Sequence, residues 1–175
     1  MAIVAGKIPG EEQIADRMAI EDVLYSHSRG LDRLDSATIG AAYWPEAEVD
    51  YGSYKGNAQS FAGLVVAALG SQYELTRHCL GNTLIEFSGN NALSESTVQA
   101  SHLLQGATEE MLFFGRYLDK LEKRDGHWKI LHRQVVMDWS RRIPVCDERT
   151  SADFAELAKG SHLDADPLYT FLATR

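Results

Sequence analysis

Four long segments rich in β-forming residues follow one another in the second half of the sequence, and they restrict the fold more than any other feature. They cover residues 77–87, 94–104, 111–123 and 127–141. Short turns separate them, and the last turn contains Asp125-Gly126, a strong hairpin signal because this pair readily adopts the positive φ that a tight turn requires. Consecutive strands joined by short turns form a meander. The pattern therefore predicts one strongly curved antiparallel sheet.

The first half of the chain is predicted to be mainly helical. Apolar residues recur at helical spacing from Glu11 to Leu31, which indicates a long amphipathic helix. A short helix is predicted over Ser36–Tyr43, with Ser36 as its N-cap. A strand over Glu48–Lys55 and a third helix over Ala58–Leu69 come next. Helices followed by a meander are typical of the α+β class, and a curved sheet wrapped around helices leaves a pocket between the two layers.

The 175 residues suit one domain. We expect a tail over residues 1–10, a single domain over 11–143 and a C-terminal extension over 144–175. Ser151 and Gly160 predict a short helix over 150–160, and Pro167 is expected to break any helix beyond it. The extension is expected to cover either the mouth of the pocket or a neighbouring subunit.

Composition excludes several classes of partner. The formal net charge is −8, and the basic residues are scattered, so nucleic acid is not an expected partner. No apolar run approaches the roughly 20 residues that span a bilayer, so no membrane association is expected. The N-terminus lacks a signal-peptide pattern, which makes a cytoplasmic location the expectation. Cys79 and Cys146 stand alone and are predicted to be buried or incidental thiols.

Several strings, in their order along the chain, resemble the SnoaL-like branch of the nuclear transport factor 2-like superfamily. They are AIEDVLYSHSRGLDRLD, SYKGNAQSF, TRHCLGNTLIEF and YLDKLEKRDGHWKILHRQV. The similarity covers roughly residues 12–142. It implies a cone-shaped α+β barrel, in which a curved antiparallel sheet wraps around N-terminal helices.

Within this branch the chain is most similar to lyases, namely dehydrochlorinases and dehydratases. The resemblance places their active site at Asp32, His78 and Arg133. His27 occupies the position of a proton-handling residue that is Lys or Tyr in those lyases. His102 matches a second active-site histidine of one of them. On an ideal helix His27 points away from Asp32, so both reach one pocket only if the helix ends near Gly30.

The chemistry of these residue types suits proton abstraction. An imidazole exchanges protons near neutral pH, and a carboxylate that accepts its second N–H fixes the tautomer of His78. Arg133 cannot act as an acid, but its donors can hold a leaving group or an enolate-like oxygen. His27 would handle the second proton of an elimination. No HxH, HxxxH or HExxH spacing occurs among the six histidines, so neither a metal nor an organic cofactor is expected.

Five aromatic residues are further candidates for substrate binding. Tyr25, Tyr51 and Tyr54 can donate hydroxyl groups to a substrate, and Phe113 and Trp139 can form pocket walls. A core or rim position is the alternative for each of them.

Structural alternatives exist for the catalytic candidates as well. His78 could be a hydrogen-bonded structural histidine. Asp32 could pair with Arg29 or Arg33 at the end of its helix. Arg133 could form a salt bridge at a subunit contact, because a charge on an otherwise apolar strand face needs a partner.

Three functions remain open. The first is a cofactor-independent lyase or isomerase acting on a small, largely apolar cyclic or aromatic compound. The others are a non-catalytic small subunit of an aromatic-ring dioxygenase and a ligand-binding protein without turnover. Leu112, Phe114 and Leu118 share one strand face, and such apolar faces are usually covered by partners. We therefore expect a homodimer or homotrimer, and the resemblance to dehydrochlorinases favours the trimer.

Overall fold

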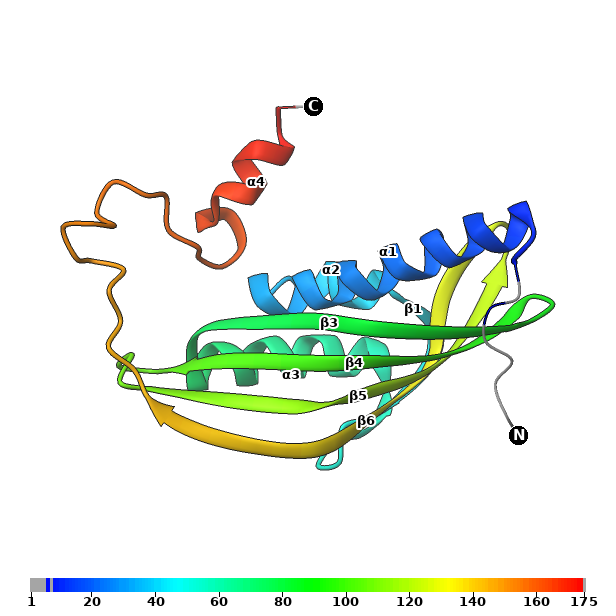
Figure 1. The fold of residues 1–175 in the computed structure, drawn as a ribbon, viewed down its shortest axis with the longest axis horizontal. Helices are drawn as coiled ribbons and strands as arrows, with labels where there is room; N and C mark the ends of the chain where they lie inside the picture. Colours follow the sequence, from blue (N-terminus) through cyan, green and yellow to red (C-terminus); the bar gives the residue numbers. More distant parts are fainter. Residues whose placement is uncertain (1–5, 7, 175) are drawn as a thin grey trace.

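The computed structural model describes residue 6 and residues 8–174. It shows helices, a six-stranded sheet and an irregular C-terminal segment (Figure 1). The elements in chain order are α1 Glu11–Arg33, α2 Ser36–Ala41, β1 Tyr43–Asp50, β2 Lys55–Asn57, α3 Ala58–Gln72, β3 Tyr73–Ser88, β4 Asn91–Leu104, β5 Glu109–Arg124, β6 His127–Pro144, the 3-10 helix η1 Leu163–Ala165 and α4 Pro167–Leu172. Most of the predicted tail, residues 1–10, lies outside the described residues.

The sheet confirms the predicted α+β fold, with one addition. Strands β3 to β6 form the antiparallel meander, and the strand order of the whole sheet is β2-β1-β6-β5-β4-β3. The addition is β1, which pairs in parallel with β6, so the sheet is mixed. The sheet is curved but does not close, because β2 and β3 remain at its edges (Figure 1).

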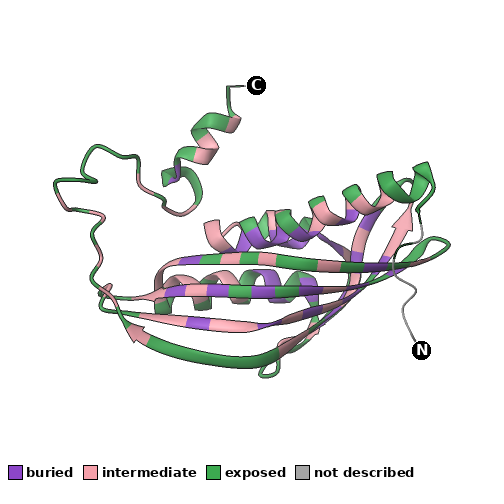
Figure 2. Cartoon of the chain, in the orientation of Figure 1, coloured by how far each residue is buried: buried purple, intermediate pink, exposed green. Residues whose placement is uncertain are grey.

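The hydrophobic core lies between the sheet and the three N-terminal helices. Helix α1 runs beside β3, and α3 lies behind the sheet in the view of Figure 1. Ile20, Leu24 and Leu31 of α1 share one face and are almost fully buried, as are Phe61 and Ala62 of α3. Exposed residues predominate along the C-terminal half of β6 (Figure 2). One side of that strand is therefore left without a covering layer.

The turn between β5 and β6 has the conformation that its sequence predicts. Asp125 and Gly126 have φ values of 50° and 78°. Two successive positive φ values are those of a type I′ turn, whose twist matches that of the flanking strands.

The N-terminal elements differ from the prediction in their boundaries. Asp35, not Ser36, caps α2, because its carboxylate accepts a hydrogen bond from the Thr38 amide at 2.9 Å. The predicted strand over Glu48–Lys55 is two strands, β1 and β2, joined by a turn in which Gly52 has a φ of 75°. The chain reverses at this turn, and β2 becomes an edge strand beside β1. The alternation of apolar and polar residues does not reveal such a reversal.

Strand β6 contains a bulge that turns one predicted site residue away from the pocket. Phe114 faces Trp139, whereas the next residue, Gly115, faces Met137, so Asp138 is an extra residue in β6. Simple alternation from Arg133 would place position 139 on the inner face. The bulge shifts the alternation by one residue, and Trp139 lies on the outer face.

Residues 145–174, here called the C-terminal arm, stand away from the sheet and return above the end of α1 (Figure 1). The predicted helix over 150–160 is wrong, since these residues form turns. Pro167 begins α4 rather than breaking a helix, because proline suits the first helical position and Asp166 caps it. Within the described part of the chain, no helix combines the length and apolar character needed to cross a membrane.

Candidate functional site

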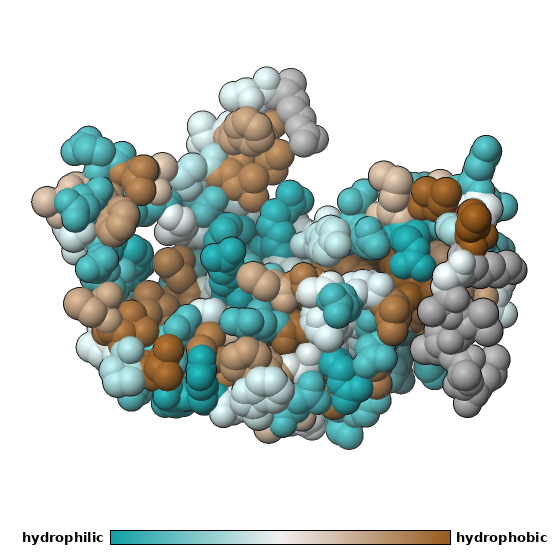
Figure 3. All heavy atoms as spheres, in the orientation of Figure 1, coloured by the Kyte–Doolittle hydropathy of each residue, from teal (hydrophilic) through white to brown (hydrophobic). Residues whose placement is uncertain are grey.

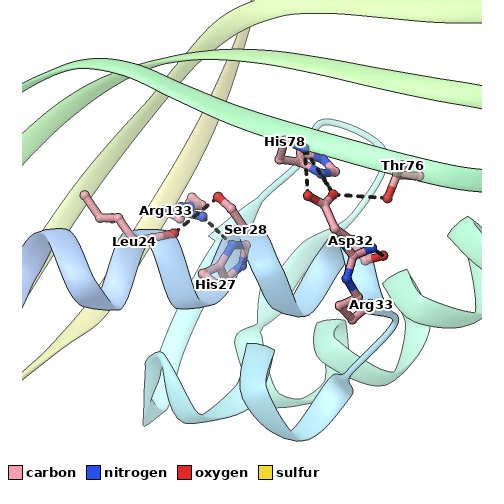
Figure 4. A network of polar contacts seen from close by, with 8 residues as sticks. All are labelled: Leu24, His27, Ser28, Asp32, Arg33, Thr76, His78 and Arg133. Atoms are coloured by element: carbon pink, nitrogen blue, oxygen red, sulfur yellow. Dashed lines mark hydrogen bonds and ion pairs between the residues drawn. The ribbon is translucent and has the colours of Figure 1, made fainter. Parts of the chain in front are cut away.

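The last turn of α1 places Asp32 against the edge strand β3, where it contacts His78. The Nδ1 atom of His78 lies 2.7 Å from Asp32 Oδ1 (Figure 4). The backbone amide of His78 donates to both carboxylate oxygens at 3.1 and 3.0 Å, and the Thr76 hydroxyl donates at 3.2 Å. Since a carboxylate only accepts, Nδ1 carries a hydrogen, and in the neutral ring Nε2 is the nitrogen with the lone pair. The arrangement presents an oriented imidazole base.

Two α1 side chains also cover the free edge of β3. Asp32 binds the amide of His78 near one end, and the Arg17 guanidinium donates to the Ile85 carbonyl at 3.4 Å near the other. Unpaired strand edges are templates for further strand pairing, and natural proteins cover them. Asp32 therefore has a structural role beside its contact with the imidazole.

His78 reaches a small apolar cavity between α3 and the sheet, here called the inner pocket, with a volume of about 200 Å³. It is lined by Leu31, Tyr51, Val65, Leu69, His78, Ala100, His102, Met111, Phe113, Tyr117 and Val135. Two buried polar atoms at this pocket, Tyr51 Oη and His102 Nδ1, have no hydrogen-bond partner among the described residues. An apolar cavity with a few convergent polar atoms is the usual form of a small-molecule site.

His102 is held neutral at the pocket wall. Burial lowers its pKa to about 4, and the neighbouring His78 acts in the same direction. The two imidazole rings meet edge to face at 5.4 Å between centroids. A neutral imidazole can donate from one nitrogen and accept at the other, so His102 is suited to a polar contact with an uncharged ligand.

A second polar cluster lies beneath the pocket floor and contains Arg133. Its Nε and Nη2 donate to the two oxygens of Asp119 at 2.7 and 2.8 Å, and both side chains are fully buried. Its Nη1 lies 2.9 Å from His27 Nδ1 (Figure 4), and the guanidinium stacks over the ring of Tyr117. Arg133 thus lies behind the residues that line the inner pocket.

His27 also belongs to this buried cluster. Helix α1 continues past Gly30 to Arg33, so His27 and Asp32 point to different partners, as expected for an uninterrupted helix. The Nε2 atom of His27 lies 3.0 Å from the Tyr43 hydroxyl, which leaves neither ring nitrogen free for a substrate. Burial, with Arg133 and His78 adding to it, holds the pKa of His27 well below its usual value.

The five aromatic candidates separate into two groups. Tyr51 and Phe113 line the inner pocket. Tyr25 is half exposed beside the outer side of Asp32, and Tyr54 donates its hydroxyl to the Asn57 carbonyl. The proposal of Trp139 as a pocket wall is corrected, because the bulge stacks it on Phe114 on the outer face, 57% exposed.

Sequence reasoning missed Asp119, Thr76 and Tyr43. Asp119 was detectable, because it alternates with Tyr117 and Leu121 on one face of a strand, and a charge on such a face needs a partner. The same reasoning holds for Arg133, the partner that Asp119 binds. The contact of Thr76 with Asp32 depends on how closely α1 approaches β3, which no local pattern encodes.

The arm forms the roof of a second, more polar hollow, here called the outer groove, of about 750 Å³. Val145 and Gly160 of the arm line it together with Asp32 and His78. Arg33 joins the arm to α1 through Asp166 at 3.4 Å. His78 thus lines both the inner pocket and the outer groove.

The described part of the chain contains no cluster of side chains that could bind a metal ion. No group of three or more His, Cys, Asp or Glu side chains is close enough there to hold an ion. Cys79 and Cys146 are both free and exposed, so neither is the buried thiol that composition allowed.

The chain is similar to known proteins in both sequence and structure. Hexachlorocyclohexane dehydrochlorinase 1 of Sphingobium indicum is 26% identical over 133 residues, which are 73% of this chain and 85% of that protein. A scytalone dehydratase-like protein from Novosphingobium aromaticivorans superposes with a TM-score of 0.69 at 24% identity, covering 77% of this chain and 91% of its own. The type 3 hexachlorocyclohexane dehydrochlorinase of Novosphingobium barchaimii gives 0.68 at 22% identity, covering 77% and 93%.

The two structural similarities establish the fold, and the match to a protein family establishes the family. The SnoaL-like domain matches residues 12–134, from the first turn of α1 into the middle of β6. This range contains Asp32, His78 and Arg133 and leaves out the arm. The chain belongs to the SnoaL-like domain family.

Proposed function

We propose that the chain is a lyase or isomerase that removes a proton from a compact, largely apolar cyclic compound without a metal or organic cofactor. The observation that carries this proposal is the His78–Asp32 pair at the wall of the inner pocket. Nδ1 of His78 is occupied by the carboxylate, so Nε2 is the atom that accepts the proton. The names of the dehydrochlorinase and dehydratase relatives support the same reaction class.

The reaction begins when His78 Nε2 takes a proton from a carbon atom of the substrate. In an elimination, the electrons of the broken C–H bond form a new double bond, and a leaving group departs from the neighbouring carbon with its own electron pair. In an isomerisation, the proton returns at another carbon. Asp32 stabilises the imidazolium that forms, because its carboxylate already accepts the Nδ1 hydrogen.

Arg133 acts on this reaction from behind the pocket lining. Asp119 and His27 bind its Nε, Nη1 and Nη2 atoms, and its side chain is fully buried, so its contribution is a fixed positive charge rather than a direct hold on the leaving group. His102 offers Nδ1 as a polar contact for a substrate oxygen. The pocket volume restricts the substrate to a compact ring system.

Deuterium exchange tests the proposal even when the product is unidentified. A panel of small cyclic ketones, hydroxyketones and chlorinated rings is incubated with the protein in D₂O, and loss of the C–H signal is followed by proton NMR. His78→Ala should lower the exchange rate of an active compound by roughly 10²- to 10⁴-fold, the usual contribution of a positioned base.

His127→Ala is the matched control, because this histidine is exposed and its side chain hydrogen-bonds to the Asp125 carbonyl of its own turn, away from the inner pocket. It should exchange the active compound at the rate of the unchanged protein. Equal rates for His78→Ala and the unchanged protein would refute the assignment of the base. A ligand that binds the inner pocket without any exchange would instead favour a binding protein without turnover.

A further inference from the structure

The turn that ends α1 has a strained backbone. Leu34, which follows the last residue of the helix, has a φ of 54°. Helices often place glycine in this left-handed conformation, because it is costly for a residue with a side chain. Asp32 lies two residues earlier, so any opening of this turn moves the carboxylate that binds His78. A strained conformation persists only where other contacts hold it.

The C-terminal arm contacts the chain on both sides of Leu34. On one side, Asp166 Oδ2 forms an ion pair with Arg33 Nε at 3.4 Å. On the other side, the Tyr169 hydroxyl donates to Asp35 Oδ2 at 3.0 Å. The second contact joins residues that are 134 positions apart in the sequence, at the place where the arm returns above the end of α1 (Figure 1). The arm therefore holds the strained turn from outside the helix.

Asp166 organises this end of the arm. It is the one buried residue among the described residues of the arm. Its carboxylate also accepts the backbone amides of Ser161 and Leu168 at 2.8 and 2.9 Å. A buried carboxylate needs hydrogen-bond donors and a positive partner, and Arg33 supplies the positive charge. The local fold of the arm and its contact with α1 thus depend on the same side chain.

Arg33 connects the arm to the residue that orients His78. Its Nη1 donates to the Asp32 backbone carbonyl at 3.1 Å (Figure 4), while its Nε faces Asp166. A guanidinium is planar and its donors have fixed directions, so holding one side of it orients the other. The contacts therefore run from Asp166 through Arg33 to the backbone of Asp32, whose carboxylate binds His78.

We propose that Asp166 and Tyr169 are positioning residues for the His78–Asp32 pair. They hold the turn around Leu34 closed, and the closed turn keeps the Asp32 carboxylate in place for its bonds to the ring and the amide of His78. The arm, which lies outside the matched family domain, thus completes the site. This inference rests on the proposed function for its effect on the reaction rate, but the position of Asp32 is measurable without a substrate.

Exchange of the His78 backbone amide in D₂O measures that position. The amide lies on the free edge of β3 and donates to Asp32, so it exchanges when the carboxylate moves away. Asp166→Asn removes the charge that binds Arg33 but still caps α4, since asparagine is also a good N-cap. In ¹H–¹⁵N NMR the His78 amide of this variant should exchange roughly 3- to 10-fold faster, the range of one such polar contact. Amides of β5, inside the sheet, should keep their rates.

Asp164→Asn is the matched control, because Asp164 is an exposed aspartate of the same arm and takes part in none of these contacts. It removes the same charge and should leave the His78 amide as it is in the unchanged protein. Tyr169→Phe removes only the hydroxyl that binds Asp35 and should accelerate exchange in the same direction as Asp166→Asn.

An unchanged rate at the His78 amide in either Asp166→Asn or Tyr169→Phe overturns the role of that residue. An equal acceleration of the β5 amides also overturns it, because it would indicate a loss of overall stability rather than a local opening at Asp32.

Catalysis provides a second readout. With a compound that the unchanged protein exchanges, Asp166→Asn should lower kcat severalfold and leave KM nearly unchanged, because the inner pocket keeps its lining while the base is less often aligned. An unchanged kcat overturns the positioning role. If the unchanged protein exchanges no compound, the proposed function fails, and the amide rates still decide whether the arm holds Asp32.

Discussion

Asp32 combines two interactions that are usually made by different residues. Its carboxylate orients the His78 ring at 2.7 Å and also binds the His78 backbone amide at the free edge of β3. A purely structural Asp32 would need only the second interaction. Substitutions that differ in which interaction they keep can therefore separate the two roles.

We expect Asp32→Asn to retain the fold and lose catalysis. The amide oxygen still accepts from the backbone of His78, but the amide group no longer stabilises an imidazolium, and it favours the wrong tautomer. The deuterium-exchange rate should fall by about 10²-fold or more. Asp32→Leu should in addition lower the free energy of unfolding by about 1–3 kcal/mol, because it leaves the amide of His78 unpaired. Urea denaturation of both variants measures the difference, and equal stabilities would contradict the edge-covering role.

Folding stability should fall as the pH drops from about 6.5 to about 4. His102 has a folded pKa of about 4, against about 6.5 when unfolded, so in this window the unfolded chain binds more protons and protonation favours unfolding. The loss from His102 between about pH 7 and pH 5 is about 2 kcal/mol, and His27 adds to it in the same direction.

Urea denaturation at the two pH values measures this loss. His102→Gln should show a smaller pH dependence than the unchanged protein. The exposed His127 provides the control, because His127→Gln should leave the pH dependence as it was. A loss of stability that is the same in all three proteins would contradict the assignment to His102.

At the scale of single elements, the meander was predictable because its strands alternate regularly and its turns use residues with positive φ. The position of Trp139 was not, because a one-residue bulge in β6 leaves no local signature. The predicted helix over 150–160 failed for a different reason. Its caps were plausible, but the segment is mostly exposed and has no layer on which a helix could bury an apolar face. His78 and Asp32 were found through family resemblance rather than periodicity.

The Asp125-Gly126 turn provides a quantitative test at this scale. Gly126→Ala should lower the free energy of unfolding by about 1 kcal/mol, because alanine is strained at a φ of 78°. Gly63 lies in the interior of α3 with open space around it. Gly63→Ala should therefore raise the free energy of unfolding by about 0.5–1 kcal/mol. Thermal or urea denaturation of the pair checks both signs.

For the whole molecule, the outer face of the sheet is the feature that bears most on assembly. Leu84 and Leu93 are more than half exposed there, and Phe114 and Trp139 stack on the same face. Further apolar side chains gather on α4 of the arm, which stands away from the body (Figure 3). A single chain leaves these surfaces in water, which is uncommon for apolar patches of this kind.

We expect a homodimer or homotrimer that covers the outer face of the sheet. Light scattering at micromolar concentration should give a multiple of the 19.4 kDa chain mass. Leu93→Glu should reduce that mass to the monomer, because it places a charge in the covered face. Leu64→Glu, on the exposed side of α3, should leave it unchanged. A monomeric mass for the unchanged protein would contradict the expected assembly.

The covered edge of β3 has a consequence for how the protein can evolve. A mutation that removes Asp32 exposes part of the free edge of β3 to other chains at the same time as it removes the His78–Asp32 pair. Loss of the proposed activity and a tendency to aggregate would thus be inherited together. Selection for solubility alone would preserve this carboxylate even in a lineage that no longer uses the chemistry. Retention of an aspartate at this position in a relative is therefore weak proof that the relative is an enzyme, whereas retention of the imidazole at position 78 is the more informative sign.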